Sequence, residues 1–563
     1  MSALTLRLGA HAQAVADRVA MLRGEGFHTR LVQRDDSLWG DDPSRRAVIA
    51  NRLGWVDSPA AMLERAGEFR DFAADVADAG FERVLLLGMG GSSLAPEVLS
   101  RVLGVGPGGL PLTMLDDTSP AAVRAAAATC DPRRTLVLVA SKSGGTIEVT
   151  SFEKAFRARA VTALGDAAGR SFVAITDPGT SLESHAGAHH YRRVFTNPAD
   201  IGGRYSALSC FGLVPAALLG VDPAELCREA MAERADLLDH GTALTLGAAL
   251  GVLAHAGRDK LTLVLGAGLE PLGVWIEQLV AESTGKEGRG ILPVDGEALA
   301  SPEAYGHDRV FVSVTIGAPD AATSAALDAL AAAGHPVIQW SRPHALGIGA
   351  EFLRWELATA VASAVLGVNP FDEPNVSEAK AATKRVLQQA TAQGVLPAHA
   401  PRARDGSLEW HAAPTVTAPE GDAVAWARAF LAWFRPGDYG AVLAYLHRTD
   451  ARHASLERVR HALRTGARAA ATLGYGPRYL HSTGQLHKGG PGTGVFLEVT
   501  VEEGDEPIPG EAFGFRTLRD AQAAGDHEVL DAHGLRALRI HVGGDADAGL
   551  ARLAEAFEAA ARG

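Results

Sequence analysis

Cysteine is scarce in this sequence of 563 residues, which contains only three. Cys130, Cys210 and Cys227 are odd in number, lie far apart and form no C-x-x-C pair. This spacing excludes a disulfide framework and a cysteine-ligated metal site. No H-E-x-x-H motif is present either, so no metal is expected. Because a reducing compartment suits so few thiols, we expect a cytoplasmic protein.

Long hydrophobic runs are also missing. The longest charge-free apolar stretch, residues 357–368, is shorter than the roughly 20 residues that span a bilayer, so it predicts a buried helix. Residues 1–26 scatter charged residues among apolar ones and show no basic leader followed by an unbroken apolar run. Neither a signal peptide nor a membrane partner is therefore expected.

Positive charge is in deficit, with 53 Lys and Arg against 66 Asp and Glu and a net charge of −13. Sequence-independent binding to nucleic acid is accordingly not expected. Any phosphate must be bound locally. At 47% hydrophobic residues the chain can bury a large core, and its length predicts about three or four domains.

Two Gly/Ser-rich turns follow short apolar runs, at residues 88–93 (Gly-Met-Gly-Gly-Ser-Ser) and 141–146 (Ser-Lys-Ser-Gly-Gly-Thr). Unhindered backbone N–H groups, hydroxyl donors and a following helix N-terminus are typical of anion capture. Neither turn ends in Gly-Lys-Ser/Thr, and Ser93 stands where the dinucleotide fingerprint needs glycine. The ligand we infer is a phosphate on something small, such as a sugar.

Short apolar runs alternate with alanine-rich helical stretches, a pattern typical of an α/β protein with doubly wound parallel sheets. Ligands of such sheets bind at the carboxyl ends of the strands, where both turns lie. The expected strands are 84–87, 112–115, 136–140, 172–176 and 193–196, then 261–265, 310–316 and 336–340, and finally 441–446, 494–501 and 537–542, with helices at 272–281 and 456–471. The expected parts are an N-terminal helical arm (1–80) broken at residues 41–43, two α/β domains (81–240 and 241–380) and a C-terminal α/β region (381–563).

Several residues outside the turns carry chemistry. Arg204 follows two glycines, so its guanidinium can approach a ligand where backbone bulk is absent. Glu282 lies at the end of a predicted helix, Lys380 lies early in another, and His481 and His487 share a Gly-rich loop. Taken alone, the arginine, the lysine and the histidines are equally well interpreted as solvated surface residues, and for Glu282 alone that interpretation is favoured. A loop histidine nevertheless suits proton transfer.

At these residues the chain resembles glucose-6-phosphate isomerases. Residues 199–212 match that family's Gly-Gly-Arg-Tyr-Ser signature, and 371–380 resemble its second signature, which ends in a catalytic lysine. Glu282 occupies the place of the catalytic base in a Glu-Ser-x-Gly-Lys setting. The likeness is closest to the isomerase part of bacterial transaldolase/phosphoglucose isomerase fusions. The stretch before Gly88 is too short for a transaldolase barrel, so that activity is not expected.

The resemblance implies two sugar-isomerase (SIS-type) domains, a small sugar-phosphate substrate, no cofactor and a homodimer. The implied reaction is the reversible isomerisation of glucose 6-phosphate and fructose 6-phosphate through ring opening and a cis-enediolate. Glu282 would move the proton, Arg204 would stabilise the enediolate, and His481 and Lys380 would assist ring opening. The implied phosphate ligands are Gly91, Ser92, Ser141, Ser143, Gly145 and Thr146.

The second signature departs from the family pattern at three positions. Glu373 stands where Gln is usual, Asn375 where Gly or Ala is usual, and Ser377 where Glu is usual. We therefore expect the local backbone and its polar contacts to differ from those of the family.

The identity of the ring-opening histidine stays open. His481 fits the Leu-His-Ser-x-Gly-Gln form of some bacterial members and is favoured, whereas His487 resembles a His-Gln-Gly form. His307 is a third candidate, because it lies between Glu282 and Lys380 as in the common isomerases.

Two other functions compete with this interpretation. One is an isomerase of mannose 6-phosphate or an amino sugar phosphate, and the other is a sugar-phosphate sensor that binds without reacting. The presence of Arg204, Glu282 and Lys380 together argues against the sensor, because a sensor needs no base.

Overall fold

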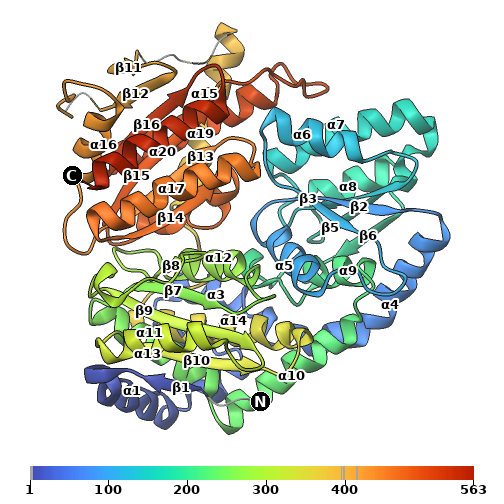
Figure 1. The fold of residues 1–563 in the computed structure, drawn as a ribbon. Helices are drawn as coiled ribbons and strands as arrows, with labels where there is room; N and C mark the ends of the chain where they lie inside the picture. The colour runs from blue at the N-terminus through green and yellow to red at the C-terminus, as the bar shows by residue number, and fades with distance from the viewer. Residues whose placement is uncertain (1–3, 395, 397–399, 414–415, 563) are drawn as a thin grey trace. The chain divides into compact units, whose positions relative to one another are not determined.

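The computed structural model describes residues 4–394, 396, 400–413 and 416–562. It is a mixed α/β protein with three sheets, each built around parallel strands, which confirms the expected fold class (Figure 1). The chain forms two compact units. Unit 1 comprises Met1–Asp116, Ala126–Leu299 and Val310–Asp372, and unit 2 comprises Asp117–Ala125, Ala300–Arg309 and Glu373–Gly563. The four-part division expected from the sequence stays a prediction.

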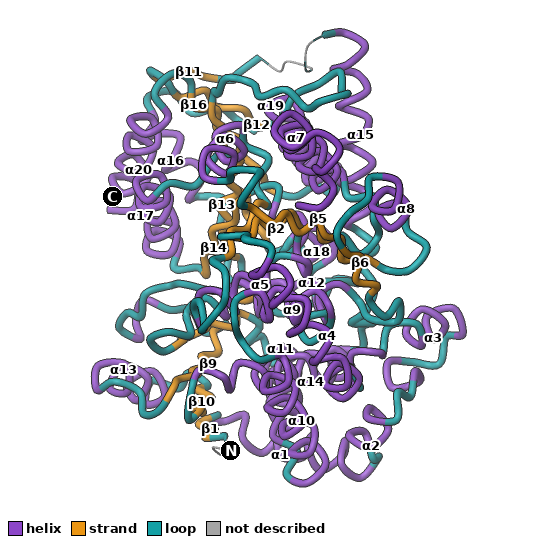
Figure 2. The backbone as a smooth tube through the Cα atoms, turned by 90° about the vertical axis from the view of Figure 1, so that its right-hand side faces the viewer, coloured by secondary structure: helices purple, strands orange, loops and turns teal. Residues whose placement is uncertain are grey.

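The first sheet of unit 1 has the strand order β3-β2-β4-β5-β6, and all its neighbours are parallel. Helices α4, α5 and α9 lie on one face and α7 and α8 on the other (Figures 1 and 2). The bounds are β2 (Arg83–Gly88), β3 (Leu112–Leu115), β4 (Thr135–Ala140), β5 (Phe172–Thr176), β6 (Arg193–Thr196), α4 (Ser58–Asp78), α5 (Leu94–Leu103), α6 (Pro120–Thr129), α7 (Ile147–Leu164), α8 (Ser181–Ala188) and α9 (Cys210–Leu218).

The second sheet of unit 1 has the order β1-β10-β9-β7-β8. The pairs β9–β10 and β7–β8 are parallel, whereas β1 is an antiparallel edge strand on β10. Helix α14 is buried along almost its whole length, as its apolar sequence predicted, and it packs against α10, α11 and α12. The bounds are β1 (Thr5–Arg7), β7 (Lys260–Leu265), β8 (Leu292–Val294), β9 (Arg309–Ile316), β10 (Val337–Arg342), α10 (Pro223–Asp239), α11 (Thr242–His255), α12 (Leu272–Thr284), α13 (Ala321–Ala332) and α14 (Ile348–Leu366).

The N-terminal region is helical apart from β1, which the sequence did not predict. The break expected at residues 41–43 is the start of a helix, because the Asp42 carboxylate caps the Arg45 N–H and Pro43 takes the first helical position. The helices there are α1 (Ala12–Gly24), α2 (Phe27–Val32) and α3 (Pro43–Ala50), followed by α4.

Unit 2 contains the third sheet, with the order β11-β12-β16-β15-β13-β14. Its four strands β13–β16 are parallel, and β11 and β12 add an antiparallel edge. Helices α16, α17 and α20 cover one face, and α15 and α19 cover the other (Figures 1 and 2). The bounds are β11 (Ala403–Asp405), β12 (Leu408–Ala412), β13 (Tyr439–Tyr445), β14 (Ala470–Tyr475), β15 (Gly494–Val501), β16 (Arg536–Val542), α15 (Val376–Gln393), α16 (Ala423–Leu431), α17 (Asp450–Ala467), α18 (Gly484–Gly489), α19 (Phe515–Ala532) and α20 (Ala546–Arg562).

The strands expected from the sequence are confirmed to within two residues at each end, but the helix expected at 456–471 was wrong at both ends, since α17 spans Asp450–Ala467. Helix α17 stops at Ala467 because Arg468 adopts a left-handed conformation with φ of 51°. The buried alanines that follow, Ala470 and Ala471, begin strand β14 instead. Alanine favours helix locally, and pairing with β13 overrides that preference here.

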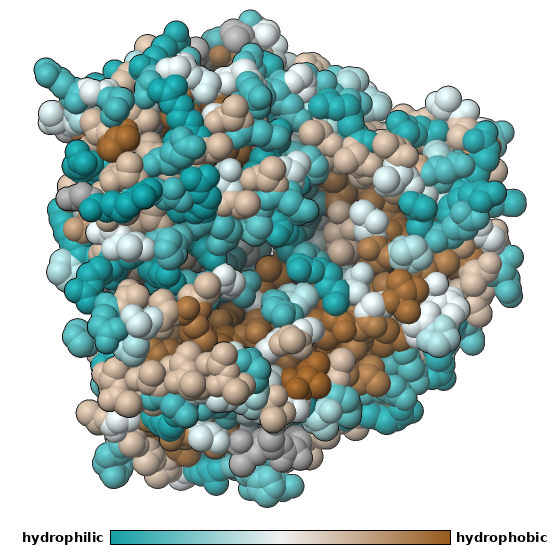
Figure 3. Space-filling view, viewed as in Figure 1, coloured by the Kyte–Doolittle hydropathy of each residue, from teal (hydrophilic) through white to brown (hydrophobic). Residues whose placement is uncertain are grey.

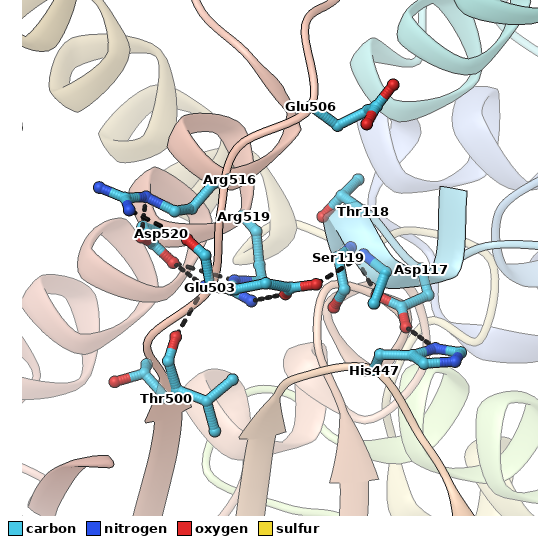
Figure 4. A network of polar contacts seen from close by, with 12 residues as sticks. Asp117, Thr118, Ser119, His447, Thr500, Glu503, Glu506, Arg516, Arg519 and Asp520 are labelled. Carbon is cyan, nitrogen blue, oxygen red and sulfur yellow. Dashed lines mark hydrogen bonds and ion pairs between the residues drawn. The ribbon is translucent and has the colours of Figure 1, made fainter. Parts of the chain in front are cut away.

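A polar network lies at the carboxyl edge of the third sheet (Figure 4). Glu503, just beyond β15, accepts hydrogen bonds from the Ala121 backbone N–H at 2.6 Å and from Arg519 Nη1 at 2.6 Å. Asp117 accepts from the Ser119 N–H at 2.8 Å and lies 3.6 Å from His447 Nδ1. The Glu503 carboxylate thus occupies the N-terminal turn of α6, and both the carboxylate and that turn belong to unit 2.

Hydrophilic and apolar residues are interspersed on the face drawn in Figure 3. Among the described residues, no single helix is both long and apolar enough to cross a membrane. Helices α10 and α11, which are joined by a bend of 72°, are together long and apolar enough, judged by length and composition only.

Candidate active site

The two Gly/Ser turns lie at one edge of the first sheet. Strands β2 and β4 are parallel neighbours, and their last residues, Gly88 and Ala140, are paired in register. The first turn continues through a 3₁₀ turn (Gly90–Ser92) into α5, and the second leads into α7. Two strand ends and two helix starts therefore converge, as the sequence predicted for a phosphate site.

The first turn packs directly on the turn that carries Arg204. A Cβ atom added at Gly91 would lie 1.9 Å from the Gly203 carbonyl oxygen, so only glycine fits there. Gly90 has a φ of 54°, a second conformational requirement for glycine. Ser92 is buried beside them. The Gly90–Ser92 turn and the Gly203–Tyr205 turn, which carries Arg204, are consequently in backbone contact.

The second turn presents hydroxyls and glycines together. Ser141 Oγ and Thr146 Oγ1 are 3.0 Å apart, and the Gly145 N–H donates to Ser143 Oγ at 3.5 Å. Thr146 is the N-cap of α7, yet its side chain makes no capping bond within that described helix. Ser143 and Gly145 are exposed, and a Cβ at Gly145 would meet nothing within 4 Å. This turn leaves room for an anion at the start of α7.

Arg204 is buried in a cage of carbonyl and hydroxyl oxygens, with 5% of its surface exposed. Its Nε donates to Ser283 Oγ at 3.0 Å, and its Nη2 donates to the backbone oxygens of Pro370 and Asp372 at 2.7 and 2.8 Å. Its Nη1 lies 3.3 Å from Glu282 Oε1. The cage fixes the guanidinium so that one of its nitrogens faces the carboxylate.

Glu282 lies in the last turn of α12, and its other carboxylate oxygen accepts from Gln278 Nε2 at 3.1 Å. Helix α12 contacts both the Gly90–Ser92 turn and the Gly203–Tyr205 turn. The Glu282 carboxylate is thus held beside the fixed Arg204 guanidinium, on a helix that contacts the Gly90–Ser92 turn. A base next to a cation suits removal of a proton beside a carbonyl, because the cation can stabilise the oxyanion that forms.

Lys286, four residues after Glu282, was not among the site residues expected from the sequence, but the structure places it beside Arg204. Its Nζ donates to the Asp372 carbonyl at 2.5 Å and to Asp372 Oδ1 at 2.8 Å. Burial, together with the nearby Arg204, lowers the pKa of Lys286 to about 8. Lys286 and Arg204 therefore share the Asp372 carbonyl. Two signals for it were present in the sequence, its place at the end of the Glu-Ser-x-Gly-Lys setting and its spacing of four residues from Glu282.

An aromatic cluster supports the cage. Tyr205 has its ring centroid 4.9 Å from that of Trp55 and 5.2 Å from that of Phe371, and its hydroxyl lies 3.2 Å from Ser283 Oγ. Burial raises the pKa of Tyr205. Since Phe371 begins the second signature, this packing joins both signatures within unit 1.

Lys380 belongs to unit 2, where it is exposed on α15. The structure shows the contacts or the exposure of the three residues that depart from the second signature. Ser377 Oγ donates to the Pro374 carbonyl at 2.8 Å, Asn375 pairs with Gln485, and Glu373 is exposed.

The three candidate histidines have different environments, all in unit 2. His487 is buried among Tyr479, Tyr439 and Phe496, with ring centroids 5.1–6.1 Å away. Neither of its ring nitrogens has a hydrogen-bond partner among the described residues, and burial lowers its pKa to about 3. His481 is half-buried at the end of a 3₁₀ turn (Arg478–His481), and His307 is exposed before β9.

The structure therefore groups most of the sequence-predicted site in unit 1. Those residues are Gly91, Ser92, Ser141, Ser143, Gly145, Thr146, Arg204 and Glu282. Lys380 and His481 belong to unit 2.

A family model described as phosphoglucose isomerase matches residues 64–253. A protein of Natronomonas pharaonis named probable glucose-6-phosphate isomerase is 30% identical over 346 residues, covering 54% of this chain and 79% of that protein. The glucose-6-phosphate isomerase of Rubrobacter xylanophilus is 29% identical over 396 residues, covering 61% of this chain and 91% of that protein.

Two solved structures share the fold. A hypothetical protein of Thermus thermophilus has a TM-score of 0.58 and 26% identity, covering 68% of this chain and 99% of that one. A glucose-6-phosphate isomerase of Chlamydia trachomatis has a TM-score of 0.51 and 21% identity, covering 65% of this chain and 79% of that one.

Proposed function

Because this chain belongs to the phosphoglucose isomerase family, we propose that it interconverts glucose 6-phosphate and fructose 6-phosphate. One observation carries the proposal beyond family membership. Arg204 and Glu282 lie 3.3 Å apart, next to a turn whose glycine contacts the arginine's own turn. A sensor of sugar phosphates would need the turn but not the base.

The proposed chemistry is a proton transfer between two adjacent carbons. Glu282 removes the proton from C2 of the open-chain aldose, and the electrons move onto the carbonyl oxygen to give a cis-enediolate. Arg204 stabilises that oxyanion with a permanent charge. The proton of the C2 hydroxyl passes to the C1 oxygen, and Glu282 returns its own proton to C1, which gives the ketose. The caged guanidinium supports this role, because it needs no rearrangement as charge develops.

The phosphate of the substrate would be bound at the edge formed by β2 and β4. Ser92, Ser141, Ser143 and Thr146 would supply hydroxyls, and Gly91 and Gly145 would supply unhindered backbone. Binding energy from this unreactive end then orients the sugar toward Glu282.

Ring opening is assigned to His481 and Lys380. The environment of His487 supports His481, because an enclosed imidazole with a pKa near 3 is a poor proton donor at neutral pH. His481 is half-buried and lies before α18 in the same loop. His307 is exposed in a separate loop and stays the third candidate.

The proposed setting is the cytoplasm, which suits three buried free cysteines. A homodimer is proposed as well. Light scattering of the purified protein tests the homodimer directly.

A coupled assay for conversion of fructose 6-phosphate to glucose 6-phosphate tests the function. We expect turnover by the wild-type protein and a loss of about 10²–10⁴-fold in Glu282→Gln, the usual contribution of a general base. Glu287→Gln, the same change on an exposed side chain, is the matched control. Wild-type protein without turnover would refute the function, whereas an active Glu282→Gln would refute only the assigned base. Mannose 6-phosphate and glucosamine 6-phosphate belong in the same panel, and no observation favours either as the substrate.

A further inference from the structure

Asn375 and Gln485 form a reciprocal pair within unit 2. The Asn375 backbone N–H donates to Gln485 Oε1 at 3.0 Å, and Gln485 Nε2 donates to Asn375 Oδ1 at 2.8 Å. One amide side chain therefore holds both the backbone and the side chain of the other residue. Because a backbone N–H can only donate, it fixes which end of the Gln485 amide is the oxygen, and the Gln485 amide then fixes the orientation of Asn375.

The pair joins the two segments to which ring opening was assigned. Asn375 is the N-cap of α15, the helix that carries Lys380 in its second turn. Gln485 lies at the start of α18, four residues after His481. Helix α15 also contacts the 3₁₀ turn Arg478–His481. The pair thus forms a direct hydrogen-bonded connection between the start of the lysine helix and the histidine loop.

Burial makes this connection more than a surface contact. Gln485 is fully buried, with 0% of its surface exposed, so its bonds to Asn375 are made away from water, where hydrogen bonds are costly to lose. Asn375 is itself oriented by a third group, because its Nδ2 donates to Glu378 Oε1 at 3.1 Å. Asparagine stands here where the family usually has a small residue, which could not supply the side-chain half of the pair.

We propose that Asn375 and Gln485 are positioning residues that set His481 and Lys380 relative to each other for ring opening. This inference rests on the proposed function. No bond to substrate is required of either amide. Their effect is on the step that opens the sugar ring and not on the proton transfer at Glu282, which lies in unit 1.

The test compares two rates in Asn375→Ala and in wild type. The first is isomerisation, and the second is interconversion of the α- and β-anomers, which needs ring opening but no transfer between C1 and C2. We expect Asn375→Ala to slow anomer interconversion about tenfold, with unchanged KM. Asn375→Asp keeps the acceptor Oδ1 and the backbone donor, but its other oxygen would face Glu378 Oε1, so it is combined with Glu378→Gln, whose amide can donate to that oxygen. This double variant should retain most of the rate. Glu378→Ala removes a bond that orients Asn375 but leaves both bonds to Gln485, so its loss should be much smaller than that of Asn375→Ala.

A double variant separates positioning from a structural defect. If the pair acts through His481, Asn375→Ala should cause little further loss in a His481→Ala background. Independent, multiplied losses in the double variant would overturn the inference, as would an Asn375→Ala protein that matches wild type in both rates. Wild-type protein that does not isomerise at all would instead refute the proposed function, and the inference with it.

Discussion

The strand-end turns of the two sheets in unit 1 share a pattern but differ in what occupies them. In the first sheet, the turns after β2 and β4 carry glycines and hydroxyls, and Gly145 faces open space. In the second sheet, the turn after β7 is also glycine-rich, yet its Gly268 N–H already donates to Glu270 Oε2 at 2.8 Å. A second carboxylate lies close to the start of the helix that follows, because a Cβ at Gly273 would lie 1.8 Å from Asp295 Oδ1.

A carboxylate of the protein thus lies where the first sheet leaves room for a phosphate. Helix α6 repeats this arrangement, since Glu503 accepts from the Ala121 N–H in its first turn. A Gly-x-Gly turn before a helix therefore does not by itself identify a phosphate site, because an internal carboxylate can already accept from its N–H groups. The deciding feature is whether an internal acid already satisfies the helix start.

The largest effect is expected from Gly91→Ala, which would break the contact between the Gly90–Ser92 turn and the turn that carries Arg204. The new Cβ would overlap the Gly203 carbonyl, so one turn must move, and a shift of about 1 Å can cost about 10²-fold in rate. Steady-state kinetics should show that loss in kcat/KM. Gly187→Ala on α8, where a Cβ meets nothing within 4 Å, is the control. Equal kinetics for both variants would contradict the assigned contact.

A second effect is expected from Ser141→Ala combined with Thr146→Ala. Hydrogen bonds to a charged group contribute about 1.5–3 kcal/mol each, so loss of both should raise KM about 10²-fold or more while kcat changes less. The measurement is initial rate against substrate concentration. Ser324→Ala, on the exposed α13 beside the second sheet, should leave KM unchanged. An unaltered KM in the double variant would place the phosphate elsewhere.

A smaller effect is expected from Asp295→Ala, which would open the start of α12. Loss of a carboxylate near a helix N-terminus typically costs about 1 kcal/mol of stability. Inorganic phosphate should then raise the unfolding midpoint of the variant more than that of wild type, because an external anion can replace the missing acid. Thermal unfolding with and without phosphate measures this difference. Identical phosphate shifts would show that Asp295 does not close an anion site.

The smallest effect concerns pH and Lys286. Its pKa is about 8 in the folded protein against an ordinary 10.5, so between these values the unfolded chain binds the extra proton. Stability of wild type should therefore rise with pH through this window, relative to Lys286→Met. Urea unfolding of both proteins at about pH 7.5 and at about pH 9.5 measures how the free energy of unfolding of each changes with pH. The first pH lies just below the folded pKa of Lys286, and the second lies between its folded and unfolded pKa values. Parallel slopes would contradict the lowered pKa.

The sequence was most informative where local signals and tertiary context agree. The first-sheet strands are short, apolar and bounded by glycine or polar turns, so their ends could be read closely. Strands β1 and β8 have three residues each and carry no periodic signal, and β14 begins with alanines that favour helix. Only pairing with distant strands makes these segments extended.

The candidate site shows the same division. Residue type and order pointed to Arg204 and Glu282, and the structure places them together. The cage that fixes Arg204 uses backbone oxygens of Pro370 and Asp372. The order of side chains in a sequence does not show where a backbone carbonyl points, so this part of the site could not be predicted. The enclosure of His487 was equally invisible, because its aromatic neighbours come from separate strands and turns.

The contact between Gly91 and Gly203 has a consequence for motion. The two backbones touch directly, and the Ser206 hydroxyl, which donates to the Gly203 carbonyl at 2.6 Å and to the Gly91 carbonyl at 3.5 Å, links them further. These contacts favour movement of the Gly90–Ser92 turn and the Gly203–Tyr205 turn as one piece. With the phosphate bound as proposed, the fixed spacing would favour sugars whose phosphate and reacting carbons are separated by the matching number of bonds.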